Sequence, residues 1–245
     1  MMNAELFYLI LFVIAALYSA VGHGGASGYL ALMALYGVAP QEMKPTALVL
    51  NLFVSLTSFI QYYRGGHFKL RIFIPIALAS IPLAFIGGMI HIEDTLYKRI
   101  LGILLLFPVF RFFFFKSPDD SELKEPRIYL SLLFGGVIGL LSGMIGIGGG
   151  ILLSPVLILL KWTNQKQTAA ISAAFIFVNS VAGLGGMFTK EVTFTGDMWM
   201  YIVCAFAGGL LGAYLASKKL NQNGLKYVLA VVLLMASYKL ISSTI

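Results

Sequence analysis

Residues Ser142–Pro155 read SGMIGIGGGILLSP and place glycines at 146, 148, 149 and 150 between two apolar runs. Each glycine costs roughly 1 kcal/mol relative to alanine inside a helix, so the stretch predicts a helix break within an apolar segment. A related stretch, Ser19–Gly28 (SAVGHGGASG), lies in the first half of the chain. Interrupted apolar segments at corresponding positions in two halves are the best pointer in a sequence to a transporter's binding site.

The composition places both breaks inside a membrane protein. Of the 245 residues, 59% are hydrophobic and 11% are charged, whereas soluble domains carry about 25% charged residues. The long uncharged runs are apolar on all sides, which favours membrane helices over the alternating strands of a barrel. The net charge of +7 comes from basic residues in short loops, a pattern that orients membrane proteins. We therefore expect a lipid bilayer and no nucleic acid as partner.

Ten apolar segments can be drawn, five in each half, and they predict an all-α polytopic membrane protein built from two repeats. The first repeat is residues 1–115, the cytoplasmic linker is 116–127 (KSPDDSELKEPR), and the second repeat is 128–245. The expected segments are 6–21, 27–36, 46–63, 72–90 and 96–115, followed by 128–145, 151–160, 168–188, 198–217 and 225–241.

The second segment of each half is too short to span a membrane alone. A helix of about 10 residues reaches roughly 15 Å, half of the hydrocarbon core. Each is therefore expected to form a broken or re-entrant pair with the segment before it, buried by other helices. Basic residues then decide how the halves are related. With Arg64–Arg71 in the cytoplasm, an inverted second half puts most basic loop residues inside, as the positive-inside rule requires, and both termini outside.

A helix that begins after such a break presents unpaired N–H groups and the positive end of its dipole. Near the centre of the bilayer this is an anion site, and the breaks contain no Asp or Glu that would favour a metal cation. We expect no cofactor and no metal. The candidate substrate-binding residues are Gly22, His23, Gly24, Gly25, Ser27, Asn51, Gly146, Gly148, Gly149, Gly150 and Asn179.

Each candidate also has a structural interpretation. Glycines in membrane helices allow close packing, which is the role expected of Gly135, Gly139 and Gly143 and of Gly208 and Gly212, spaced by four residues. Such ridges also permit a homodimer. Asn51 and Asn179 would serve equally well in hydrogen bonds between helices. His23 could bind the anion, carry a coupled proton or pack as a neutral side chain.

Several motifs together resemble the sulfite exporter TauE/SafE family. They are the two glycine blocks, Lys44–Ala47 (KPTA), Gln167–Ala170 (QTAA) and Gly208–Ala213 (GGLLGA). The resemblance covers about residues 6–241 and is closer in the second half, because His23 interrupts the first block and Ala26-Ser27 stand where Gly150-Ile151 would be. It implies export of sulfite, organosulfonates or related small anions across the bacterial inner membrane, coupled to a proton or sodium gradient.

Two rival functions remain at this stage. One is transport of a small carboxylate or another organic anion. The other is an intramembrane serine protease, because Gly25–Gly28 (GASG) fits the G-x-S-G pattern around Ser27, with His67 or His91 as the general base. No G-x-x-x-x-G-K-[ST] motif for a nucleotide occurs, which argues against ATP-driven transport. We expect a transporter and not an enzyme.

Overall fold

The computed structural model describes residues 4–20, 25–114, 122–189, 197–216 and 222–243. Within these ranges the chain forms ten α-helices and no strand, so the predicted all-α class is confirmed. The first five helices are α1 (Ala4–Ala20), α2 (Ala26–Leu35), α3 (Pro40–Arg64), α4 (Leu70–Met89) and α5 (Asp94–Phe114). The second five are α6 (Ile128–Ile145), α7 (Gly150–Leu159), α8 (Gln165–Met187), α9 (Asp197–Ala216) and α10 (Gln222–Ser242).

Nine of the ten described helices begin before the predicted apolar segments, and two of these early starts have a clear physical cause. Helix α3 begins at Pro40 rather than Thr46, since proline suits the first helical turn and Glu42 lies there beside the positive helix end. Helix α8 begins at Gln165 rather than Thr168, because Asn164 and Gln167 form a capping box. Every other described helix begins within three residues of its predicted start.

Four helices in the described ranges are long and apolar enough to cross a membrane, namely α3, α4, α6 and α8. Helices α2 and α7 have 10 residues each. Both are buried along nearly their whole length, whereas α4 and α6 expose many large apolar side chains. The short helices therefore lie in the protein core, and the longer ones form much of the surface that lipid would cover.

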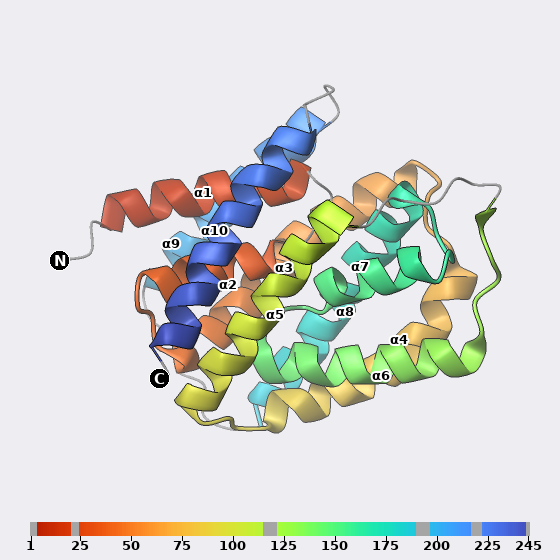
Figure 1. Ribbon diagram of the computed structural model, residues 1–245, viewed down its shortest axis with the longest axis horizontal. Coiled ribbons are helices and arrows are strands. Elements are labelled where there is room, and N and C mark those ends of the chain that lie inside the picture. The colour runs from red at the N-terminus through yellow and green to blue at the C-terminus, as the bar shows by residue number, and fades with distance from the viewer. Residues whose placement is uncertain (1–3, 21–24, 115–121, 190–196, 217–221, 244–245) are drawn as a thin grey trace.

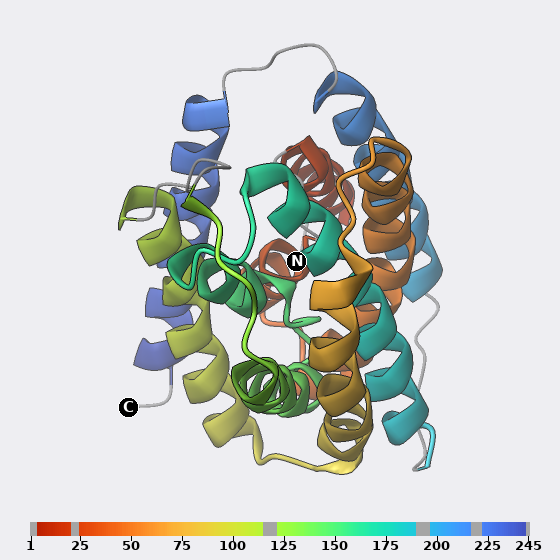
Figure 2. The same cartoon turned by 90° about the vertical axis from the view of Figure 1, so that its right-hand side faces the viewer.

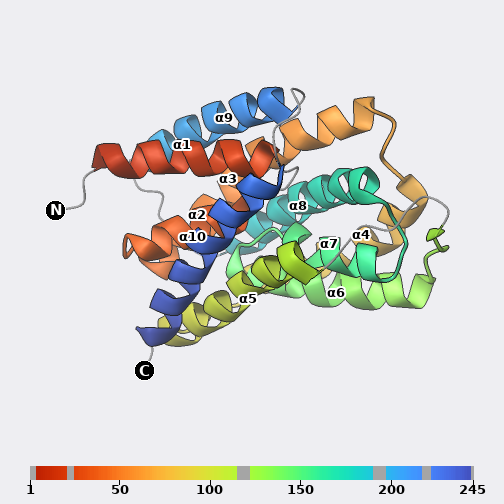
Figure 3. The same cartoon turned by 45° about the horizontal axis from the view of Figure 1, so that its top comes forward.

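Helices from opposite halves pack together most closely. Helix α4 lies against α6, and α1 lies against α9 (Figures 1 and 3). Helix α5 lies against α10, as Figure 2 shows from the side, and α3 lies against α8. If α1–α5 are matched in order to α6–α10, the pair α4–α6 corresponds to α9–α1. Each half thus places its fourth helix on the first helix of the other half.

Glycines make these contacts possible. A Cβ atom at Gly143 would overlap the carbonyl oxygen of Ala84. One and two turns earlier along α6, Cβ atoms at Gly139 and Gly135 would overlap the carbonyl oxygens of Ser80 and Ile76. A Cβ atom at Gly212 would overlap the carbonyl oxygen of Ala16. Backbones can approach this closely only where neither side chain intervenes. The packing role predicted for these glycines is confirmed, and its full set is Gly135, Gly139, Gly143, Gly208 and Gly212.

Polar contacts at the helix ends show which ends lie together. At one end, Arg71 Nη1 lies 3.4 Å from Glu125 Oε1, and Lys161 Nζ lies 2.6 Å from Glu122 Oε2. The Lys161 ammonium lowers the pKa of the Glu122 carboxyl. These contacts join the start of α4, the segment before α6 and the turn between α7 and α8, all at the right of Figure 1.

The other end is joined by a second set of contacts. Gln41 Nε2 donates to Asp94 Oδ1 at 2.7 Å, which brings the starts of α3 and α5 together. Lys239 Nζ donates to the carbonyl oxygen of Leu35 at 2.6 Å, which brings the end of α10 to the end of α2. These ends lie at the left of Figure 1.

Candidate binding site at the two helix breaks

The second break is built from left-handed glycines. Helix α6 ends at Ile145, and Gly146 follows with φ of 84°. Gly148 and Gly149 also have positive φ, 74° and 75°, and α7 begins at Gly150. Residues with a Cβ atom rarely adopt this conformation, so three such positions in four residues explain why the stretch is rich in glycine. The predicted break is confirmed here.

The first break is described only at its end. Gly22, His23 and Gly24 lie outside the described residues. Gly25 has φ of 72° and directly precedes α2, as Gly149 precedes α7. The first helical hydrogen bond of α2 runs from the Tyr29 N–H to the Gly25 carbonyl.

Both short helices therefore begin with N–H groups that have no acceptor within the helix or from the side chain of the cap residue. Gly25 and Gly149 stand at the capping positions, and neither cap provides a side-chain hydrogen bond. The first N–H groups of a helix have no acceptor within the helix and form the positive end of its dipole. Both helix starts are buried, so water cannot readily replace the missing acceptors.

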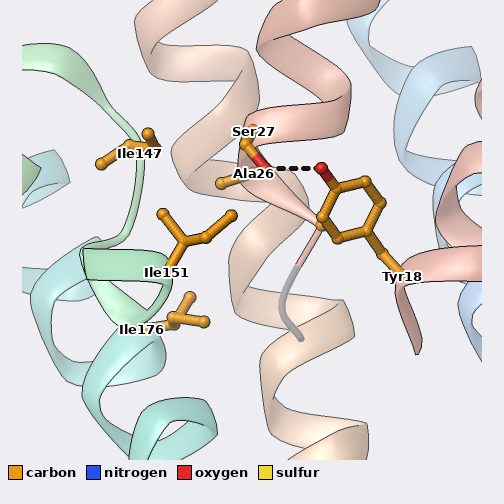
Figure 4. A pocket seen from close by; sticks show the side chains of 7 residues that line it. Tyr18, Ala26, Ser27, Ile147, Ile151 and Ile176 are labelled. Atoms are coloured by element: carbon orange, nitrogen blue, oxygen red, sulfur yellow. Dashed lines mark hydrogen bonds between the residues drawn. The ribbon is translucent and has the colours of Figure 1, made fainter. Parts of the chain in front are cut away.

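The two helix starts meet at one small cavity. The first half contributes Gly25, Ala26, Ser27 and Tyr18, and the second half contributes Ile147, Ile151 and Ile176 (Figure 4). The space within it that the centre of a water molecule can reach is about 10 Å³, which is room for about one water. Residues far apart in the chain thus enclose a site between the halves.

The cavity has a polar side and an apolar side. The Ser27 and Tyr18 hydroxyl oxygens lie 2.7 Å apart in a hydrogen bond, and both residues are 1% exposed. The three isoleucines face them from the second half (Figure 4). The polar groups that could recognise a solute in this cavity therefore come from the start of α2 and from α1.

Of the predicted residues that the structure describes, Gly25 and Ser27 line this cavity. The predicted glycines of the second break lie beside it, where Ile147 and Ile151 provide the lining. These glycines pack against neighbouring helices. A Cβ atom at Gly149 would lie 2.7 Å from Phe175, and one at Gly150 would lie 2.5 Å from Ile176.

The two predicted asparagines are fully buried but do not line the cavity. Asn51 faces the second break, since a Cβ atom at Gly148 would lie 2.7 Å from its Nδ2. Neither polar atom of the Asn51 side chain has a hydrogen-bond partner among the described residues. Asn179 Nδ2 donates to the Phe175 carbonyl within α8 at 2.8 Å, and its Oδ1 has no partner in the described structure.

Several residues near the breaks were missed by the sequence reasoning. Tyr18 and Ile176 line the cavity, but each is one more apolar or aromatic residue in a long apolar run. Tyr97 of α5 donates to the carbonyl of Ile145, the last residue of α6, at 2.8 Å. Lys44 is 9% exposed and donates to the carbonyl of Gly88 at 3.2 Å. Lys44 belongs to the KPTA motif, but its contact with the end of α4 cannot be read from the sequence.

The surroundings of Ser27 do not resemble a serine protease site. Its described side-chain hydrogen bond is to Tyr18. His67 precedes α4 and His91 follows it, so the two candidate bases stand at opposite ends of a 20-residue helix, about 30 Å long. No hydrogen bond between either histidine and Ser27 is found among the described residues.

Comparison with known proteins gives a consistent result. The family model described as "Sulfite exporter TauE/SafE" matches residues 7–240. A probable membrane transporter protein of Sinorhizobium fredii, y4hK, is 36% identical over 234 residues, which cover 94% of this chain and 95% of that protein. The probable membrane transporter protein YjnA of Bacillus subtilis is 25% identical over 259 residues, covering 98% of this chain and all of YjnA. No solved structure matches the chain.

Proposed function

Because this chain belongs to the sulfite exporter TauE/SafE family, we propose that it is a secondary transporter of sulfite, an organosulfonate or a related small anion. The chain is a multi-pass membrane protein. In the proposal it works in the bacterial inner membrane, without enzymatic activity and without a cofactor.

One observation carries the proposal. Two glycine-initiated helix starts, one from each half, stand at the same buried cavity. Helix N-termini favour anions because unpaired N–H groups and the helix dipole both point at the ligand. The Ser27 and Tyr18 hydroxyls are hydrogen-bonded to each other, so the pair adds one further O–H donor without adding charge. Among the described residues that line the cavity there is no Asp or Glu, so no carboxylate there would repel an anion.

The size of the cavity bears on the transport cycle. A water-sized space is too small for a sulfonate, so the halves must move apart to admit one. The short helices α2 and α7 belong to different halves, and their starts would separate in such a motion. We infer that the described conformation is closed to both sides, and that opening exposes the helix starts alternately to each.

The inverted relation of the halves is part of the proposal. It is supported by the contacts at the helix ends, which put the start of α3 with the end of α10 and the start of α8 with the start of α4. Corresponding helices then run in opposite directions, as Figure 1 suggests for α3 and α8. Helices α2 and α7 would be the re-entrant arms of two helical hairpins.

Cysteine labelling tests this orientation. After Cys204 is replaced by alanine, single cysteines at Glu93, Ser243 and Glu125, all exposed, are treated with an impermeant reagent in intact cells. We expect labelling at Glu93 and Ser243, and protection at Glu125 until the membrane is opened. Protection of Ser243 while Glu93 is labelled from outside would disprove the inverted arrangement, because Glu93 precedes α5 and Ser243 follows the corresponding helix α10.

Flux measurements test the function itself. Purified protein in liposomes is offered sulfite, thiosulfate, a sulfonate and a small carboxylate under imposed proton or sodium gradients. We expect uptake of at least one sulfur oxyanion, and we expect Ser27→Ala to weaken it because one donor is lost. Ser131→Ala is the matched control, since Ser131 is equally buried but its hydroxyl donates to the Arg127 carbonyl. Selective uptake of the carboxylate would move the proposal to organic anions, and no flux of any anion would refute it.

A further inference from the structure

Beside the cavity, α3 and α8 bury a row of polar side chains, each with at least one atom that has no hydrogen-bond partner among the described residues. On α3 these are Asn51, Ser55 and Ser58, and on α8 they are Asn179 and Ser180. Each is at most 2% exposed. Within the described part of the chain, none of their hydroxyl oxygens and neither amide oxygen has a hydrogen-bond partner. We call these five residues the α3–α8 seam.

The seam residues lie on the sides of α3 and α8 that pack together. Helices α3 and α8 are packed together, and a Cβ atom at Gly183 would touch Leu48 at 3.4 Å. Asn51 Nδ2 and Ile176 Cγ2 lie 2.7 and 2.8 Å from the Cβ position of Gly148, so they are close neighbours. Along α3, residues 51, 55 and 58 share the side of residue 48, and along α8, residues 179 and 180 share the side of 176 and 183.

The chemistry of the seam suits a monovalent cation. Asn179 uses its amide nitrogen on the Phe175 carbonyl, which leaves Oδ1 as a free acceptor. With Asn51 Oδ1 and the serine oxygens, the seam offers only neutral oxygen ligands besides one free amide nitrogen. Hard cations bind oxygen, but divalent ions normally need carboxylates, and the seam has none. Buried polar groups without partners are rare in proteins, so an occupant is expected.

We propose that the α3–α8 seam is a sodium site and that this sodium ion is coupled to the transported anion. The coupling rests on the proposed function. Ile176 lines the anion cavity and also lies beside Asn51, so one side chain separates the two sites. A seam of neutral ligands leaves the cation charge uncompensated, and an anion in the cavity supplies the opposite charge. Each ion then raises the affinity for the other by the same factor.

Thermal unfolding of the purified protein in detergent tests the site without requiring transport. Sodium chloride is titrated against N-methylglucamine chloride at constant ionic strength and pH. A saturating ligand that binds only the folded state raises the unfolding midpoint, and for a protein of this size we expect roughly 3 °C or more. Ser55→Ala and Ser180→Ala should each abolish the sodium effect or raise the half-saturating concentration at least about tenfold. Ser131→Ala, a buried serine outside the seam, should keep the wild-type response.

The outcomes separate this inference from the proposed function. Equal midpoints in the two salts would mean that the seam holds water or nothing, and would overturn the sodium site even if sulfite is transported. A sodium effect that survives in both seam variants would place the ion elsewhere and would also overturn it. A sodium effect lost in the seam variants supports the site. If sulfite then fails to lower the half-saturating sodium concentration, the site stands and its coupling to the anion is refuted.

Discussion

Gly149→Ala should abolish anion transport, or lower its rate at least about tenfold, while the protein still inserts and folds. Two costs act together at this position. Gly149 has φ of 75°, where a Cβ atom costs roughly 1–2 kcal/mol, and that Cβ atom would lie 2.7 Å from the Phe175 ring and 3.0 Å from Ile138. The backbone at the start of α7 must shift to relieve the overlap. The shift turns the unpaired N–H groups away from the cavity, and transport falls because the anion loses its donors.

Gly37→Ala is the matched control for this variant. Gly37 also has φ of 75°, in the turn after α2, but no atom lies within 4 Å of its Cβ position. The same substitution therefore carries the conformational cost without the overlap. We expect Gly37→Ala to lower the unfolding midpoint slightly and to transport at nearly the wild-type rate. If both variants transport equally well, the start of α7 has no role in binding the anion.

The second large effect is expected on stability. Gly143→Ala should lower the free energy of unfolding by roughly 1–3 kcal/mol, because its Cβ atom would overlap the backbone carbonyl of Ala84 on α4. A backbone group cannot rotate away as a side chain can, so the two helices must separate along their contact. For a protein of this size the unfolding midpoint should fall by about 2–4 °C for each kcal/mol, measured in detergent by thermal unfolding.

Gly185→Ala provides the comparison on a helix of the same core. Its Cβ atom would lie 3.5 Å from the Phe85 ring, an ordinary contact, and alanine is the better helix former by about 1 kcal/mol. We expect this variant to be as stable as the wild type or slightly more stable. Gly212→Ala should behave like Gly143→Ala, because its Cβ atom would overlap the Ala16 carbonyl at the corresponding contact. A neutral Gly143→Ala would mean that the α4–α6 contact is looser than described.

Much of the fold could be predicted because membrane helices are long apolar runs and the breaks are glycine clusters. Gly146, Gly148 and Gly149 have positive φ, a conformation that residues with a side chain rarely adopt, so the glycine cluster alone indicates where the helix breaks. The start of α3 was wrong by six residues because Lys44 and Glu42 look like a loop. Their charges are accommodated at a helix end, where Lys44 reaches the carbonyl of Gly88.

The candidate site could be predicted only in part. That two helix starts belong to it followed from the repeat. Which side chains complete it depends on how α1, α2, α7 and α8 cross, and no local pattern records those crossings. Tyr18 therefore went unnoticed in its apolar run, and Asn179, a polar residue at helix depth, bonds within its own helix instead of facing the cavity. The substrate-binding roles of the candidate residues remain predictions.

The packing of the fourth helix of each half on the first helix of the other half constrains the order in which the protein can fold during synthesis. The backbone of α1 is fitted to glycines of α9, and that of α4 to glycines of α6. As the chain leaves the ribosome, α1 is made long before its partner α9 has been translated. Until then its tightest packing surface faces lipid or the translocon. The first half therefore should not mature alone: expressed without residues 128–245, it should be degraded, and co-expression of the missing half should rescue it.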